Sequence, residues 1–142
     1  MSEEYEKYIG LHVVGKKEKK YTIGNFINKG GNGFIHECTD ELNEIFVVKV
    51  LHDFGKEQIK LSNFNKEMAL QESLNSPYIV KCIDSGSLRA KDQRKNRPFY
   101  IMKKYQKSLD QMINDNEISP IDAYKYSLQL CRAIKTMHKR VE

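Results

Sequence analysis

Alternating apolar and polar residues over the first hundred positions predict a small antiparallel sheet. The clearest strand is residues 45–51, which are rich in β-branched side chains. The other strand candidates alternate or are bounded by turn residues, and they comprise residues 21–27, 34–39, 78–85 and 99–105. Because the glycine-rich stretch 29–33 separates the first two candidates, we expect these two to form a hairpin.

A change to the helical period of 3.6 residues predicts helical structure between and after the strands. The predicted helices are residues 57–74, 108–114 and 120–139. The last begins with a strong start signal, in which Ser119 caps the helix, Pro120 takes its first position and Asp122 its third. The order of elements is that of an α+β protein in which one helix is inserted into a sheet and more helices follow it.

Size and composition indicate one domain with a single compact core, or part of a larger domain. The 142 residues suit a single domain, and 39% hydrophobic with 30% charged residues is polar but not disordered. No apolar run approaches the roughly 18 residues that cross a bilayer, and residues 1–11 lack the features of a signal peptide. We therefore expect no membrane partner.

The charged residues and the cysteines indicate the class of ligand and the cellular compartment. A net charge of +5 favours anionic ligands without distinguishing a nucleotide from nucleic acid. The three cysteines, Cys38, Cys82 and Cys131, are far apart and form no paired motif, which argues against a disulfide framework or a zinc site. We expect a reducing compartment, the cytoplasm or alternatively the nucleus.

Two charged residues fall at positions where the pattern predicts apolar surroundings. Lys49 lies in the middle of an apolar strand, on the face that also carries Val47 and Leu51. Glu67 lies on the apolar side of the predicted helix 57–74. Each has an ordinary alternative, a lysine on an edge strand with its head in water and a solvated glutamate at the margin of the helix face. A buried ammonium would otherwise need an anionic partner, and a buried carboxylate a cation.

The third feature is the glycine-rich turn, which contains Gly30, Gly31 and Gly33. Glycines allow backbone N–H groups to approach phosphate oxygens closely, so such turns often hold nucleotides. A glycine-rich hairpin tip is also common as a simple turn. The turn alone therefore does not distinguish a nucleotide site from a simple hairpin.

Together, these features resemble the protein kinase family. The stretch from Ile27 to Ile35 resembles the phosphate-covering loop G-x-G-x-x-G-x-V, with Asn28 at the first glycine position. Phe46-Val-Val-Lys49 resembles the V-A-I-K strand, and Glu67, 18 residues after Lys49, matches the helix glutamate that pairs with that lysine.

The resemblance continues toward the C-terminus. Residues 76–80, Ser-Pro-Tyr-Ile-Val, resemble the His-Pro-Asn-Ile-Val turn after the helix, and residues 99–105 resemble the fifth strand leading into the hinge. Met102 would then be the gatekeeper, and Lys103 stands where the family often has an acid. The long helix 120–139 resembles the buried helix that precedes the catalytic loop.

The resemblance covers about residues 21–142 and implies a kinase N-lobe, a five-stranded antiparallel sheet with one inserted helix, followed by the hinge and two C-lobe helices. Residues 1–20 have an acidic start, a short apolar stretch and a basic run, and we expect them to form an N-terminal extension. The resemblance implies an N-lobe at about 21–102, a hinge at about 103–107 and the start of the C-lobe at 108–142.

It also implies ATP with Mg²⁺ and phosphoryl transfer to a protein, more specifically to Ser or Thr. Lys49 and Glu67 would be the catalytic residues. The nucleotide-binding residues would be Ile27, Gly30, Gly31, Gly33, Ile35, Val47, Lys49, Met102, Lys103 and Tyr105.

The printed sequence contains no His-Arg-Asp, Asp-Phe-Gly or Ala-Pro-Glu stretch. These motifs supply the family's catalytic base, metal ligands and activation segment. We therefore expect the sequence to stop before the catalytic loop, and the 142 residues alone to be inactive.

Two other functions compete with an enzymatic one. A non-catalytic, kinase-like regulatory fragment is disfavoured because it would not need both Lys49 and Glu67. An RNA-binding KH-like module is suggested by the glycine turn in a basic chain, but its GXXG loop joins two helices, whereas residues 34–39 predict a strand. A dinucleotide-binding Rossmann fold fails for a similar reason, since a helix should follow Gly33. Nucleic acid is therefore an unlikely partner.

Overall fold

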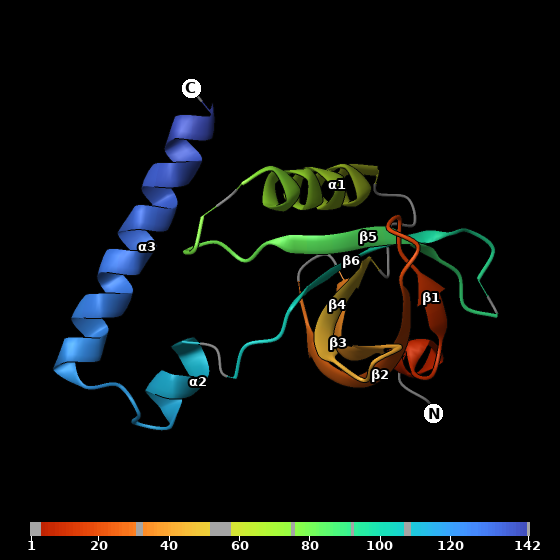
Figure 1. Ribbon diagram of the computed structural model, residues 1–142, viewed down its shortest axis with the longest axis horizontal. Helices are drawn as coiled ribbons and strands as arrows, with labels where there is room; N and C mark the ends of the chain where they lie inside the picture. Colours follow the sequence, from red (N-terminus) through yellow and green to blue (C-terminus); the bar gives the residue numbers. More distant parts are fainter. Residues whose placement is uncertain are drawn as a thin grey trace.

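The computed structural model describes residues 4–30, 33–51, 58–74, 76–91, 93–106 and 109–141. Six strands form one antiparallel sheet in the order β1-β2-β3-β4-β6-β5 (Figure 1). Their bounds are β1 His12–Val14, β2 Lys20–Lys29, β3 Gly33–Asp40, β4 Ile45–Leu51, β5 Cys82–Leu88 and β6 Arg97–Lys103. The helices are η1 Glu4–Tyr8, which is a 3₁₀ helix, α1 Gln58–Ser73, α2 Leu109–Asn114 and α3 Pro120–Val141.

The predicted α+β architecture is therefore confirmed, with one correction to the number of strands. The sequence predicts five strands, whereas the structure has six, because residues 12–14 of the stretch assigned to an extension pair with β2. The pairing buries Val13 opposite Tyr21, and Tyr8 of η1 is also buried in the core. The N-terminal stretch thus contributes to the hydrophobic core.

The predicted strand at 78–85 is also displaced, since β5 begins only at Cys82. A turn occupies the intervening residues. The backbone N–H of Tyr78 donates to Ser76 Oγ, and the N–H of Ile79 donates to the Ser76 carbonyl. These bonds divert Tyr78 and Ile79 from the strand ladder.

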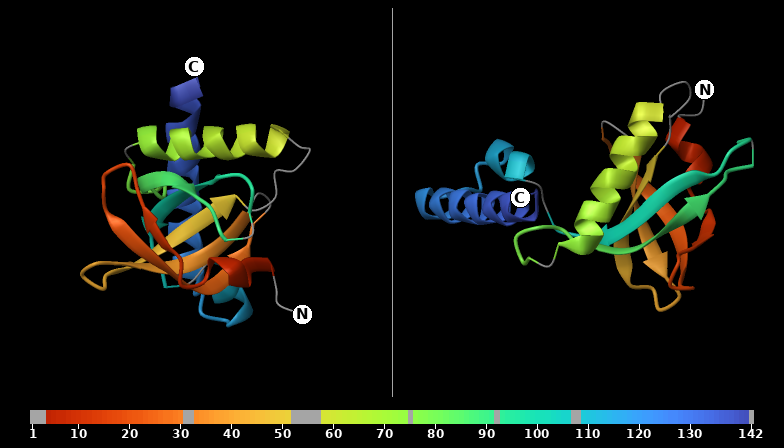
Figure 2. Two further views of the ribbon diagram at one scale, coloured as in Figure 1. Left: turned by 90° about the vertical axis from the view of Figure 1, so that its right-hand side faces the viewer. Right: turned by 90° about the horizontal axis from the view of Figure 1, so that it is seen from above.

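Strand alternation in β4 divides the core into two clusters. Val48 and Val50 face a large cluster that also contains residues of η1, β1, β2, β3 and β6. Leu51 faces a smaller cluster with Phe64 and Tyr100, which joins helix α1 to the sheet. Figures 1 and 2 show α1 lying across the sheet on the side of β5. This second cluster fixes the position of α1 relative to β4.

Aromatic rings of η1 also pack in the large cluster. Tyr5 stacks on Phe26 with ring centroids 4.0 Å apart, and both rings lie beside the fully buried His36. His36 Nδ1 lies 3.1 Å from the carbonyl oxygen of Gly24, in a part of β2 where the register shifts. His36 is thus enclosed mainly by aromatic surface.

Helices α2 and α3 lie apart from the sheet (Figures 1 and 2). The predicted start of α3 is confirmed, because the Asp122 N–H donates to Ser119 Oγ and the Ser119 N–H donates to Asp122 Oδ2. Much of the helix is uncovered, and its exposed large apolar residues are Ile121, Tyr124, Leu128, Leu130 and Ile134. Arg132 contacts the sheet-bearing part of the chain, where its guanidinium donates to the hydroxyl of Tyr78. Within the described ranges, no helix is long and apolar enough to cross a membrane.

Candidate functional site

An ion pair joins the middle of the sheet to helix α1. Lys49 Nζ on β4 lies 2.9 Å from Glu67 Oε1 on α1. The side chain of Lys49 is 12% exposed and that of Glu67 is 37% exposed, so the ammonium is much the more buried of the two groups. Because β4 lies between β3 and β6, the edge-strand alternative for Lys49 is wrong. The pairing predicted from the sequence is formed.

A tyrosine hydroxyl contacts the same carboxylate. Tyr100 on β6 is 1% exposed, and its hydroxyl donates to Glu67 Oε1 at 2.7 Å. Burial of the ring, together with the hydrogen bond to Glu67 and the negative charge of Glu67, raises the pKa of Tyr100 well above its usual range. The hydroxyl therefore keeps its proton and remains a donor.

Sequence reasoning missed this tyrosine, although the pattern contained a signal for it. Tyr100 is the register partner of Lys49 across the β4–β6 pair. Side chains opposite each other on neighbouring antiparallel strands lie on the same face of the sheet. Once residues 45–51 and 99–105 are aligned as neighbours, Tyr100 falls beside Lys49.

The glycine turn joins β2 and β3 above this pair. The N–H of Gly30 donates to the carbonyl of Gly33 at 2.8 Å, which closes the hairpin. A Cβ built on Gly30 would lie 3.6 Å from Lys49 Cε, so this backbone passes directly over the lysine side chain. Gly31, which the sequence also assigns to the site, lies outside the described residues. Since the turn joins two strands, the KH-like and Rossmann interpretations are wrong.

Gly33 is required for close packing of β3 against β4. A Cβ at this position would lie 1.9 Å from the carbonyl oxygen of Val50 on β4. No side chain fits there unless β3 and β4 separate. Gly33 therefore allows the hairpin to approach the strand that carries Lys49.

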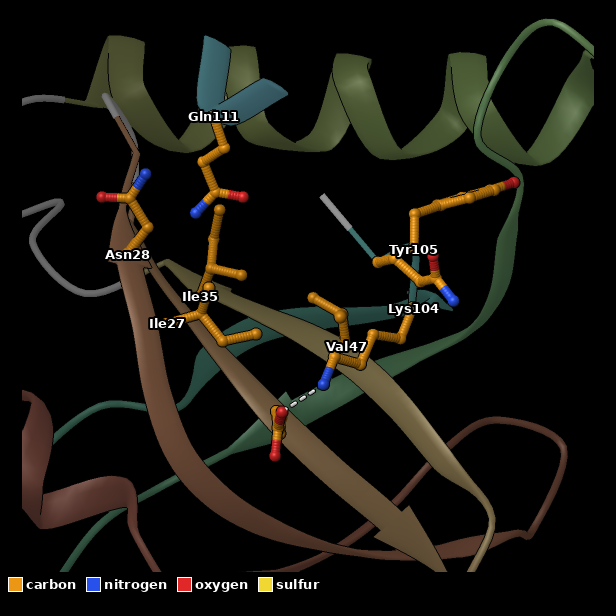
Figure 3. Close-up of a pocket in the computed structure, with 9 residues that line it drawn as sticks. Ile27, Asn28, Ile35, Val47, Lys104, Tyr105 and Gln111 are labelled. Carbon is orange, nitrogen blue, oxygen red and sulfur yellow. Dashed lines mark hydrogen bonds and ion pairs between the residues drawn. The ribbon is translucent and has the colours of Figure 1, made fainter. Parts of the chain in front are cut away.

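A cleft of about 610 Å³ opens beside the ion pair, between the sheet and the chain that follows β6 (Figure 3). Ile27, Ile35 and Val47 provide aliphatic surface, as the sequence predicts, and Tyr105 lies at the opposite side. The remaining lining residues are polar or charged: Asn28, Glu37, Lys104, Gln106 and Gln111. Ile35 is the register partner of Lys49, so the two side chains lie on the same face of the sheet and the lysine adjoins this lining residue.

A family model described as the protein kinase domain matches residues 21–141. The chain belongs to the protein kinase family. A comparison with curated protein sequences finds no significant match. In this kinase, the six-stranded sheet with α1 corresponds to the N-lobe, and α2 and α3 correspond to the start of the C-lobe, as the sequence resemblance implies.

Ile27, Ile35, Val47 and Tyr105 are the described residues assigned to the kinase nucleotide site that line the cleft. Lys49, Gly30 and Gly33 lie next to it, whereas Met102 and Lys103 point elsewhere. Met102 pairs with Val47 in the sheet and packs against the smaller hydrophobic cluster, next to Phe64 and Tyr100. Lys103 is exposed, and its ammonium lies 5.6 Å from the centroid of the Tyr105 ring. The backbone on either side of Lys103 joins β6 to the cleft residues Lys104 and Tyr105.

A second ion pair crosses the wall of the cleft and was not anticipated. Lys104 Nζ, just after β6, donates to Glu37 Oε1 of β3, as the dashed line in Figure 3 shows. The signal in the sequence is alternation, because Glu37 follows Ile35 by two residues and so faces the same side of β3. Its partner Lys104 comes from 67 residues later in the chain, and no local pattern connects the two.

In the parts of the chain that the structure describes, no three His, Cys, Asp or Glu side chains are grouped so that they could hold a metal ion. The residues that the sequence resemblance connects with ATP are cleft side chains, the hairpin backbone and Lys49.

Proposed function

We propose that this chain carries the ATP-binding part of a protein kinase that phosphorylates Ser or Thr side chains of proteins. The observation that carries the proposal is the Lys49–Glu67 ion pair, which lies beneath the backbone of Gly30 and next to Ile35, a residue that lines the partly apolar cleft. A largely buried ammonium beside an open cleft is well suited to an anionic ligand.

Each part of the site has a distinct role in this proposal. Ile27, Ile35 and Val47 would contact one face of the adenine ring from the sheet side of the cleft, and their burial favours binding through the hydrophobic effect. The ammonium of Lys49 would bind phosphate oxygens of ATP. Glu67 would hold that ammonium in place before ATP arrives, so less ordering is needed upon binding.

ATP would supply the phosphoryl group that is transferred, and in this family it is bound together with a divalent metal ion. The protein would contribute orientation and charge stabilisation. Because the 142 residues contain no His-Arg-Asp or Asp-Phe-Gly stretch, we propose that these residues alone bind ATP but do not transfer phosphate. Incubation with radiolabelled ATP and a basic protein substrate should therefore give no labelled protein, and clear labelling would contradict this part of the proposal.

ATP binding is tested by titrating the chain with a fluorescent ATP analogue. Lys49→Met should weaken binding at least tenfold, a change equivalent to about 1.4 kcal/mol. Lys20→Met is a matched control, because it removes the same charge from an exposed side chain whose ammonium lies 4.0 Å from Glu41. Circular dichroism checks that both variants fold. Equal affinities for the two variants would contradict the proposed site and would favour a kinase-like module that binds no nucleotide there.

A further inference from the structure

Tyr100 does not line the cleft, and its hydroxyl is buried. It nevertheless shares the oxygen Glu67 Oε1 with the ammonium of Lys49. We propose that Tyr100 is a positioning residue, whose hydroxyl holds the Glu67 carboxylate beside Lys49 and so prepares the lysine for phosphate. The inference rests on the proposed ATP site and extends it to a residue outside the cleft.

The geometry suits this role because the two donors come from adjacent strands. Lys49 on β4 and Tyr100 on β6 are register partners, and both strands are interior in the sheet. Glu67 Oε1 therefore receives two hydrogen bonds from a rigid part of the fold, at 2.9 and 2.7 Å. A carboxylate oxygen can accept both bonds at once.

The ring of Tyr100 also packs against helix α1 and so helps to fix its position. Its centroid lies 5.2 Å from that of Phe64, which is fully buried and lies three residues before Glu67 on α1. Residues three apart lie on neighbouring positions of one helix face. Tyr100 thus holds α1 through an apolar contact at Phe64 and a polar contact at Glu67.

The hydroxyl also keeps Glu67 in place when a bound phosphate competes with Glu67 for the ammonium of Lys49. Phosphate oxygens near Lys49 would draw its ammonium away from Glu67, because both are anionic acceptors. Tyr100 is neutral and buried, so an anionic ligand does not compete for it in the same way. Its hydrogen bond keeps Glu67 oriented while Lys49 moves between the carboxylate and the ligand.

Tyr100→Phe tests the role because it removes the hydroxyl and keeps the ring against Phe64. Tyr21→Phe is a closely matched control, since Tyr21 is also buried and its hydroxyl also donates to a carboxylate, Asp84 Oδ2, at 3.3 Å. Two readouts are compared in the full chain: affinity for the fluorescent ATP analogue, and the rate at which an amine-reactive reagent acylates Lys49, followed by mass spectrometry.

Tyr100→Phe should weaken analogue binding about threefold to tenfold, because a hydrogen bond to a charged group is lost. It should also speed acylation of Lys49, since the amine is then engaged less often by Glu67. Tyr21→Phe should leave both values near those of the unaltered chain. Adding Tyr100→Phe to Glu67→Gln should change Lys49 acylation less than Tyr100→Phe does alone, because the hydroxyl acts through the carboxylate.

The role is refuted if Tyr100→Phe leaves Lys49 acylation unchanged, or if Tyr21→Phe changes it equally, which would indicate only a general loosening of the core. Should Tyr100→Phe fail to fold, Tyr100→Met carries the same expectations, because it fills the site with an apolar side chain that has no hydroxyl. If the unaltered chain binds no ATP analogue, the proposed function fails, while the acylation rates still decide whether Tyr100 positions Glu67 and Lys49.

Discussion

The energy of the Lys49–Glu67 pair can be measured by a double-mutant cycle on stability. The variants are Lys49→Met, which removes the ammonium but retains an apolar chain, Glu67→Gln, which removes the negative charge but keeps an acceptor for Tyr100, and both together. Each is unfolded in urea and followed by circular dichroism. The coupling energy is the part of the double variant's change that the two single changes do not add up to.

The structure sets the expected size of that coupling. At the observed Nζ–Oε1 separation of 2.9 Å, two unit charges attract by about 6 kcal/mol if the effective dielectric constant is about 20. Much of this attraction is offset, because Lys49 loses nearly all of its hydration and Glu67, at 37% exposed, remains screened by water. Exposed pairs contribute about 0.2–1 kcal/mol, so this half-buried pair should give a coupling of about 1–2 kcal/mol.

The exposed pair of Lys20 and Glu41, 4.0 Å apart with both side chains 69% exposed, provides a control cycle with the same substitutions. Its coupling should lie close to zero, because the charges are solvated and their separation is longer. Raising the salt concentration should reduce the Lys49–Glu67 coupling only modestly, since the ammonium is largely buried. A coupling at Lys49 and Glu67 no larger than that of the control pair would refute the electrostatic reasoning on which the site is built.

Three further predictions concern other parts of the fold. Gly33→Ala should destabilise the protein by more than about 2 kcal/mol in urea unfolding, because its Cβ would lie 1.9 Å from a backbone oxygen, whereas at Gly24 the nearest atom would be 3.5 Å away and Gly24→Ala should cost less than about 1 kcal/mol. Burial lowers the pKa of His36, so the unfolded chain binds the proton more readily and stability should fall as the pH drops below about 6.5; a His36→Gln variant with an equally steep fall between about pH 7.5 and 5.5 would disprove this. Ser119→Ala should weaken the start of α3 by about 1 kcal/mol, seen as faster amide hydrogen exchange in its first turn but not in α1, and unchanged exchange would show that the cap contributes little.

The sequence predicts those parts of the kinase fold that local patterns determine. Strand Ile45–Leu51 has the predicted bounds, because its β-branched residues suit a strand that is buried on both faces. Local patterns place Lys49 and Glu67 each on an otherwise apolar face, and the resemblance to the kinase family is what predicts that the two pair. The start of α3 at Pro120, capped by Ser119, is equally local.

Features that depend on distant partners were missed or displaced. A strand as short as His12–Val14 has little local signal, and its conformation follows from pairing with β2 and from the adjoining aromatic contacts of η1. The Glu37–Lys104 pair likewise depends on two segments that meet only after the sheet has formed. The bond between Tyr100 and Glu67 needs the β4–β6 register, which no single stretch of sequence specifies.

The packing of η1 and β1 has a practical consequence for anyone preparing a shorter version of this protein. The kinase family match begins at residue 21, which makes that position an obvious place to start a recombinant fragment. Such a fragment would lose the rings of Tyr5 and Tyr8 and would leave residues 21–29 of β2 as a border strand, with the backbone groups that had paired with β1 unsatisfied. Strands of that kind readily associate with other chains, so the trimmed fragment should precipitate or self-associate where the longer chain does not.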